Sequence, residues 1–264
     1  PTPTAAQVRA RVDAAVRKIR AEQPSGAISV AAVNTVSGKS YSSGARSGMW
    51  MASSYKLLVV EALLLHQRSL SDYQVDQATA AIENSDNTAG YSLFLAAGGN
   101  SGLSSAASRF GMTHTVPGRS DPTFTHTSAL DCVRLLRNLV RSNGPFDAGT
   151  RSFVLGLMRD VEADQRWGVG VLADRGSTFY NKNGWLAVDN SNGSDEADDD
   201  LWIASSLGIV TIKGQQVLMA VLTQHQDSFD GGVALVQRLA RTIAPAVTRF
   251  EISAPRGARA DPGG

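Results

Sequence analysis

The sequence has a single cysteine, Cys132, which excludes an internal disulfide framework and a zinc site built from cysteine ligands. No apolar run reaches the roughly 18 residues that a membrane-spanning helix requires, and the longest run, LLVVEALLL, carries Glu61 at its centre. Charge of one sign is not in excess, because 25 basic residues stand against 24 acidic ones, and this argues against nucleic acid as the main partner. No secretory signal peptide is visible.

What the sequence does contain is enough apolar material for a large core. Of its 264 residues, 42% are apolar and 19% are charged, and this length fits one large domain or two interleaved smaller ones. Lysine is scarce next to arginine, and a buried lysine, unlike arginine, can lose its proton and act as a base. Each lysine is therefore a candidate for chemistry: Lys18, Lys39, Lys56, Lys182 and Lys213.

Secondary-structure patterns change twice along the chain. Thr4 and Gln7 form a capping-box pattern, and the apolar residues that follow repeat with the helical period up to Pro24. Residues 27–44 are rich in β-branched residues around a Ser-Gly-Lys turn and predict a hairpin. The pattern then turns helical until about residue 160, and strands return before a last helix. The expected helices cover 54–67, 74–82, 86–97, 101–110, 128–141, 147–162 and 231–247, and the expected strands cover 176–186, 201–213 and 215–224.

The order of these elements predicts the fold class. Strands at both ends of the chain must pair across the helical block, because this hides their edges. We therefore expect an α/β fold, with an antiparallel sheet flanked by N- and C-terminal helices and an inserted all-helical domain. The α/β domain would be discontinuous, at residues 5–48 and 165–250, and the all-helical domain would cover 49–164. Residues 251–264 are expected to form a disordered tail.

The acidic run at residues 189–200 raises the question of calcium. A calcium loop needs glycine at its sixth position, whereas Gly193 is fifth after Asp189. We therefore predict a solvated loop there. No pair of histidines has the helical spacing of a metal hydrolase, so no metal site is expected.

The motif with the clearest chemical meaning is Ser53-x-x-Lys56, the one Ser-x-x-Lys pattern in the chain. Residues three apart lie on one face of a helix, so Lys56 would project beside Ser53. A serine at a helix N-terminus sits where free N–H groups favour a developing oxyanion, and a lysine in apolar surroundings can be neutral enough to take its proton. A serine N-cap followed by an ordinary surface lysine fits the same pattern, and the motif alone does not decide between them.

Two further short motifs follow in the chain. They are Ser-Asp-Asn at residues 85–87, which alone is typical of a helix cap, and Lys-Asn-Gly-Trp at 182–185, which alone is typical of a strand near a turn. In this order with Ser53 and Lys56, they resemble the three motifs of class A β-lactamases and penicillin-binding D,D-peptidases. The segments MASSYKLLVVEALL, SDNTAGYSLFLAAGG and TSALDCVRLLRNLV are also similar to this superfamily, and the resemblance covers roughly residues 5–250.

The resemblance implies a role for each residue of the first two motifs. Ser53 would be the acylated nucleophile, and Lys56 would be its general base, directly or through water. Ser85 would relay a proton to the leaving nitrogen. Asn87 would orient Lys56 and hydrogen-bond an amide of the substrate.

The third motif would complete the substrate site. Lys182 would supply positive potential for a substrate carboxylate and hold Ser85, and the backbone N–H groups of Ser53 and Trp185 would form the oxyanion hole. Asn183 stands where the family usually has threonine or serine. Its amide donates a hydrogen bond at a different reach from a hydroxyl, so we expect carboxylate recognition to differ.

Deacylation is the step for which the resemblance is weakest. Class A β-lactamases use an omega-loop glutamate, and the matching position here is Asp121, with Thr125 in place of the family's asparagine. Aspartate is one methylene shorter, and a misplacement of about 1 Å can cost on the order of a hundredfold in rate. Asp121 is therefore either the deacylation base or the first residue of an Asp-Pro turn. Without a competent base the acyl-enzyme would clear slowly.

The implied function is a serine hydrolase that acts through a Ser53 acyl-enzyme on amide or ester bonds, with β-lactams as substrates. A D,D-carboxypeptidase or esterase acting on acyl-D-Ala-D-Ala substrates and a penicillin-binding sensor without turnover are the alternatives. A Ser-His-Asp hydrolase is disfavoured, since the chain has no Gly-x-Ser-x-Gly elbow. The family implies no cofactor, a small-molecule or peptidoglycan-peptide substrate, a monomer, and an exported location.

Overall fold

The computed structural model describes residues 2–23, 26–67, 69–188 and 201–248. The predicted acidic loop at 189–200 and the predicted tail at 251–264 lie outside the described residues.

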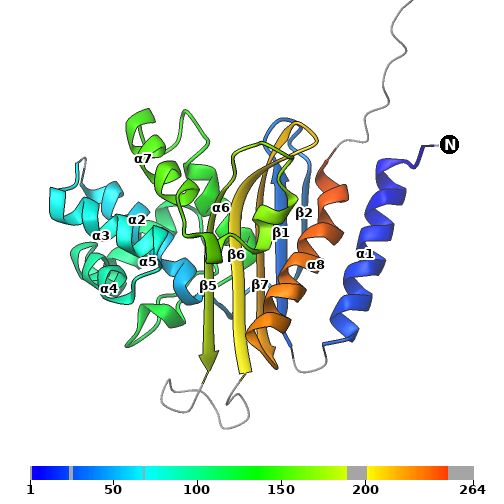
Figure 1. The fold of residues 1–264 in the computed structure, drawn as a ribbon, viewed down its shortest axis with the longest axis horizontal. Coiled ribbons are helices and arrows are strands. Elements are labelled where there is room, and N and C mark those ends of the chain that lie inside the picture. Colours follow the sequence, from blue (N-terminus) through cyan, green and yellow to red (C-terminus); the bar gives the residue numbers. More distant parts are fainter. Residues whose placement is uncertain (1, 24–25, 68, 189–200, 249–264) are drawn as a thin grey trace, which may run out of the picture.

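A five-stranded antiparallel sheet forms the centre of the molecule, with strand order β2-β1-β7-β6-β5 (Figure 1). Pairing of β1 with β7, in which Val30 lies opposite Val221, joins the two ends of the chain, as the order of elements predicted. The edge strands are β2 and β5. The strand bounds are β1 Ile28–Asn34, β2 Ser40–Gly44, β5 Tyr180–Val188, β6 Leu201–Ile212 and β7 Gln215–Gln226.

One predicted strand begins later than expected. The sequence predicted a strand from residue 176, whereas β5 begins at Tyr180. Asp174 explains the difference, because it holds its neighbourhood in a turn: its backbone oxygen accepts from Ser177 N at 2.9 Å. Its carboxylate accepts from the backbone N–H groups of Lys213 and Gly214, at the tip of the β6–β7 hairpin, at 2.9 and 2.8 Å.

Two long helices cover one face of the sheet, and Figure 1 shows them side by side. They are α1, Ala5–Ala21, which starts with the predicted Thr4–Gln7 capping box, and α8, Phe229–Val247. Apolar residues of α1 and α8, such as Val16 and Leu239, form one core with Val221 and other residues of the sheet. The apolar period of the N-terminal sequence is therefore explained by burial of one helix stripe.

The other face of the sheet packs against the helical block that interrupts the sheet in sequence. The helices are α2 Tyr55–His66, α3 Asp72–Glu83, α4 Asn87–Ala96, α5 Gly99–Arg109, α6 Ala129–Asn138 and α7 Ala148–Arg159. Leu136 of α6 and Leu57 of α2 share a core with Leu218 of the sheet. The α/β fold with an antiparallel sheet, flanking helices and a helical insertion is therefore confirmed.

Helix α2 is the central element of this block. All its residues from Tyr55 to Leu63 are buried, which explains why its sequence is apolar on every side rather than on one stripe. A pair of two-residue strands, β3 Met49–Trp50 and β4 His126–Thr127, precedes it and was not predicted. No helix in the described part of the chain is long and apolar enough to cross a bilayer.

Candidate active site

The start of α2 carries the first motif. A short 3-10 helix, η1 (Ala52–Ser54), leads into α2, so Ser53 lies just before the first α-helical turn rather than inside it. Ser53 is partly exposed, whereas Lys56 is fully buried. Lys56 Nζ lies 3.0 Å from Ser53 Oγ, within hydrogen-bond distance. Ala52 has φ of +45°, an unusual value for a residue with a side chain, and such backbone strain clusters at functional sites.

The remaining contacts of Lys56 decide which way its lone pair points. Nζ donates to the backbone oxygen of Ser85 at 2.6 Å and to Asn87 Oδ1 at 2.7 Å, and both oxygens can only accept. A neutral amine has two N–H bonds, and these two acceptors use both of them. The lone pair is then left for the hydroxyl of Ser53, which is the arrangement that a general base requires.

Burial makes the neutral form of Lys56 accessible. It lowers the pKa of Lys56 to about 8, and the carboxylates of Asp86 and Asp121 oppose this by favouring the ammonium form. Gly90 on α4 leaves room for the lysine stem, because a Cβ at this position would lie 2.8 Å from Lys56 Cε. Any larger residue at position 90 would press on the buried amine.

Ser85 lies between two lysines. Its Oγ accepts from Lys182 Nζ at 2.8 Å and lies 3.4 Å from Lys56 Nζ. The residue has φ of +59°, in the left-handed region, on the loop between α3 and α4. Asp86 then caps α4 by accepting from Ala89 N at 2.7 Å, so the Ser-Asp-Asn motif is both a helix cap and a side-chain bridge. The result is a continuous path from Ser53 through Lys56 and Ser85 to Lys182.

Lys182 reaches this path from the edge strand β5. It is fully buried, and burial together with repulsion by Lys56 lowers its pKa well below the ordinary value. Its Nζ also donates to the backbone oxygen of Asn183 at 3.1 Å. Two amines that share one hydroxyl partner in a dry site resist carrying two charges, so protonation of one disfavours protonation of the other.

The backbone of β5 lies directly against η1. A Cβ on Gly184 would stand 2.5 Å from Met51 O and 2.6 Å from Ser54 N, so only glycine allows this approach. Trp185 follows Gly184 on the strand, and its main chain therefore lies beside the nucleophile segment. Ser205 on β6 fastens the two together, since its Oγ lies 2.9 Å from Met51 O and 3.2 Å from the backbone oxygen of Gly184. Sequence reasoning missed Ser205; its signal is a serine pair inside an otherwise apolar strand.

The side chain of Asn183 is turned away from this group of residues. It is buried, and its Nδ2 donates to the backbone oxygens of Gln165 and Trp167 at 2.8 and 3.0 Å. Both amide hydrogens that the sequence assigned to a substrate are therefore engaged within the protein. The ring of Trp185 packs against Trp167 and Phe229, with centroid distances of 6.1 and 6.0 Å.

Asp121 occupies an exposed turn. Its Oδ1 accepts from Thr123 N at 2.7 Å, which caps the short 3-10 helix η2 (Pro122–Phe124). The turn is anchored to the nucleophile segment, because Met51 N donates to Thr125 O at 3.0 Å. Asp121 is also close enough to raise the pKa of Lys56, as noted above. Its role as a deacylation base stays a prediction.

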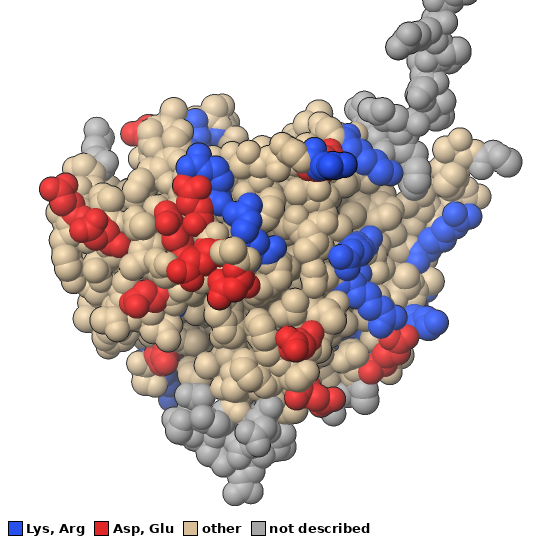
Figure 2. Space-filling model, viewed as in Figure 1, with Lys and Arg blue, Asp and Glu red and all other residues tan. Residues whose placement is uncertain are grey.

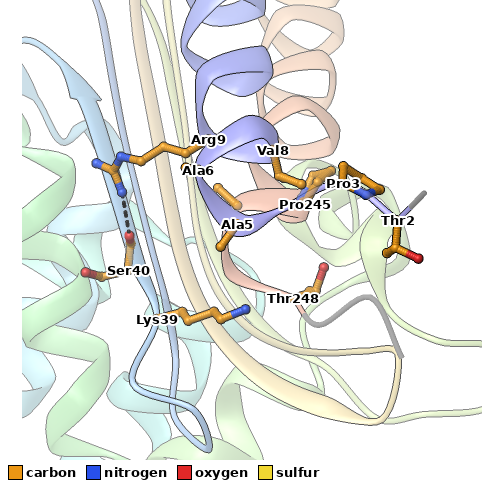
Figure 3. A pocket seen from close by; sticks show the side chains of 11 residues that line it. Thr2, Pro3, Ala5, Ala6, Val8, Arg9, Lys39, Ser40, Pro245 and Thr248 are labelled. Carbon is orange, nitrogen blue, oxygen red and sulfur yellow. Dashed lines mark hydrogen bonds between the residues drawn. The ribbon is translucent and has the colours of Figure 1, made fainter. Parts of the chain in front are cut away.

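One well-formed cavity lies away from these residues. It has a volume of about 480 Å³ and is lined by the first turn of α1, by Lys39 and Ser40 of the β1–β2 hairpin, and by the end of α8. Figure 3 shows Lys39 extending between these elements, with Arg9 donating to Ser40 O. It therefore adjoins β2, the edge of the sheet opposite β5. Across the described ranges, no three His, Cys, Asp or Glu side chains are grouped so that they could hold a metal ion.

Comparison with known proteins assigns the chain to a family. The model of the beta-lactamase enzyme family matches residues 71–247, more than half of the chain, and the chain belongs to this family. The match includes Ser85, Asn87 and Lys182 but begins after Ser53 and Lys56, so these two residues rest on the geometry described above. Comparison with curated protein sequences finds no match.

Solved structures show the same fold at low sequence identity. PBP-A is 18% identical, with a TM-score of 0.72 over 88% of this chain and 94% of that chain. TLA-1 extended-spectrum β-lactamase is 14% identical, with a TM-score of 0.70 over 89% and 99% of the two chains. A variant of the last common ancestor of class A β-lactamases of Gram-negative bacteria is 20% identical, with a TM-score of 0.70 over 89% and 97%. One PBP-A structure is an acyl-enzyme complex with penicillin G.

Proposed function

We propose that this protein is a serine acyl-transfer enzyme of the β-lactamase and penicillin-binding type, in which Ser53 is the nucleophile. The single observation that carries the proposal is the hydrogen-bonded path from Ser53 Oγ through Lys56 Nζ and Ser85 Oγ to Lys182 Nζ. It joins residues from three separate parts of the sequence, and each has an atom type suited to accept or donate a proton.

The proposed reaction begins with proton transfer from Ser53 Oγ to neutral Lys56. The oxygen attacks the carbonyl carbon of an amide or ester, and the backbone N–H groups of Ser53 and Trp185 stabilise the oxyanion. The bond to the leaving atom then breaks, and that atom takes a proton from Ser85, which recovers one from the lysines. The products of this half-reaction are a Ser53 ester and the protonated leaving group.

Turnover then depends on how fast water removes the acyl group. Asp121 is the proposed base for this step. It is exposed and already accepts a backbone hydrogen bond, and both features weaken a general base. We therefore propose slow deacylation, which favours a penicillin-binding protein or D,D-peptidase over a fast β-lactamase. The acyl-enzyme of the structurally similar PBP-A with penicillin G supports this choice. We also propose a monomer that is exported, since both substrate classes occur outside the cytoplasm.

The test is intact-mass spectrometry after incubation with penicillin G. Wild-type protein is expected to gain the mass of one penicillin molecule and to keep it over minutes. Ser53→Ala should gain nothing, whereas Ser54→Ala, which removes the neighbouring hydroxyl, should still be acylated. Loss of penicillin without an adduct would instead indicate a fast β-lactamase, and neither adduct nor loss in wild-type protein would refute the proposal.

A further inference from the structure

The segment at residues 162–167 forms a wall on one side of the proposed active site. At one end, Glu162 N donates to Glu83 O at 3.1 Å, and Asn84 Nδ2 donates to Glu162 Oε1 at 2.5 Å. At the other end, Asn183 holds Trp167 O, as described above. The segment is thus tied both to the loop that carries Ser85 and to β5. Because Ser85 is the residue that would protonate the leaving atom, the leaving group faces this wall.

Aromatic rings gather where the wall meets β5. Trp167 and Trp185 are both partly exposed and pack edge to face, and Phe229 lies 5.8 Å from Trp167 between centroids. Trp202 extends the cluster through Phe229, at 5.6 Å. Lys182 and Trp185 project from opposite faces of β5, but β5 is an edge strand, so a group lying along this edge can contact both faces.

Donors for a substrate carboxylate are scarce at this position. Asn183 and Trp185 pair on β6 with Ser206 and Ala204, neither of which carries a positive charge. Ser206 Oγ already accepts from Val169 N at 3.0 Å. The hydrogens of the Asn183 amide are also engaged, and a buried donor that serves the protein is not free to serve a ligand.

The nearest arginine along the wall is also engaged elsewhere. The guanidinium of Arg166 stacks over the ring of Phe179 at 4.4 Å and donates to Arg159 O at 2.8 Å. Arg159 in turn is paired with Asp160. Neither guanidinium is therefore available as the second half of a carboxylate clamp.

The charge around the wall is also unfavourable to an anion. Glu162 and Asp164 belong to the wall and are exposed. Figure 2 shows acidic side chains gathered over the region that α3 and the end of α7 occupy in Figure 1. Partial burial and the carboxylate of Asp160 raise the pKa of Glu83, beside the Ser85 loop, which is the response of an acid in a negative potential.

We propose that the leaving group of the physiological substrate is an uncharged aromatic group that packs on Trp167 and Trp185, rather than a carboxylate-bearing amine. This inference rests on the proposed function, since it describes the leaving group of the same acylation. The substrate class is an aryl ester or aryl amide. Asn183 is a positioning residue, because it fixes the backbone of Trp167 and does not contact the substrate.

Two esters that share one acyl group test the charge of the leaving group. Phenyl phenylacetate and 3-carboxyphenyl phenylacetate give the same acyl-enzyme and differ only in the carboxylate on the departing phenol. We expect kcat/KM for the phenyl ester to be at least equal to that for the carboxylated ester. If Ser53 is acylated and the carboxylated ester is faster by tenfold or more, this inference is overturned while the proposed function stands. If neither ester nor penicillin G acylates Ser53, both fall.

Substitution of Trp167 tests the aromatic contact. An aromatic pair contributes roughly a few-fold to tenfold in equilibrium terms, so Trp167→Ala should lower kcat/KM for the phenyl ester by about that factor, and Trp167→Phe should retain most of it. Hydrolysis of the acyl-enzyme should keep its wild-type rate, because the phenol has already left. Trp50→Ala, at the far end of β5, serves as the matched control. Equal slowing of acylation and deacylation in Trp167→Ala would show a structural role and overturn the inference.

Discussion

The pKa of Lys56 gives the account its most quantitative prediction. Burial lowers the pKa of Lys56 from 10.5 to about 8. An amine with its ordinary pKa would be neutral in about 0.03% of molecules at pH 7, whereas one with a pKa near 8 is neutral in about 10%. The shift corresponds to about 3 kcal/mol, and it raises the population of the competent base by roughly 300-fold.

The rate of Ser53 acylation by penicillin G should therefore rise with pH and level off above about pH 8. Asp86 and Asp121 favour the charged amine, so removing either charge lowers the pKa of Lys56 further. Asp86→Asn keeps a side chain that can cap α4, and it should move the midpoint of the pH profile to lower pH by up to about one unit. The assay is stopped-flow or quenched-flow acylation from pH 5 to 10.

A second variant controls for general charge effects. Asp76 is exposed on α3, and Asp76→Asn should leave the midpoint unchanged. Because Lys56 and Lys182 share Ser85, the measured midpoint belongs to the pair of amines rather than to one residue. An acylation rate that is independent of pH between 6 and 9, or a midpoint that moves to higher pH in Asp86→Asn, would refute the reasoning.

Three further predictions concern the core, the space around the base, and deacylation. Glu61 is fully buried with Asn138 as its partner, and burial raises its pKa well above 4.5, so ionisation destabilises the fold as pH rises above 4.5. Glu61→Gln should be more stable than wild type by about 1–3 kcal/mol at pH 8 and by less at pH 5 in urea unfolding, and a difference independent of pH would contradict this. Gly90→Ala should gain up to about 1 kcal/mol of helix propensity yet slow acylation about tenfold or more by displacing Lys56, and an unchanged rate would count against the crowding argument. Asp121→Asn should slow hydrolysis of the acyl-enzyme at least about tenfold while acylation keeps its rate, and an unchanged lifetime would remove Asp121 as the base.

The parts of the fold that follow local rules could be predicted from the sequence. The capping box at Thr4 and the hairpin turn at Lys213 are set by residues a few positions apart, and the structure has both. The pairing of Ser53 with Lys56 follows in the same way from the repeat of a helix. The expectation that the ends of the chain pair followed from the need to hide strand edges, and β1 and β7 satisfy it.

Other features depend on contacts between distant segments, and the sequence carries no local signal for them. The inward turn of Asn183 exists because the carbonyls of Gln165 and Trp167 lie over β5, which only the folded chain shows. The strands β3 and β4 are too short for any period to be read. The left-handed backbone of Ser85 is imposed by its surroundings, since a local preference would have selected glycine.

The central claim is that Ser53 is the atom acylated, and peptide mapping tests it most directly. After incubation with penicillin G, tryptic digestion and fragmentation of the peptide that ends at Lys56 locate the adduct among its serines. The account predicts the penicilloyl group on Ser53 in wild-type protein. An adduct on Ser54, on a serine elsewhere in the chain, or unchanged labelling of Ser53→Ala would contradict it.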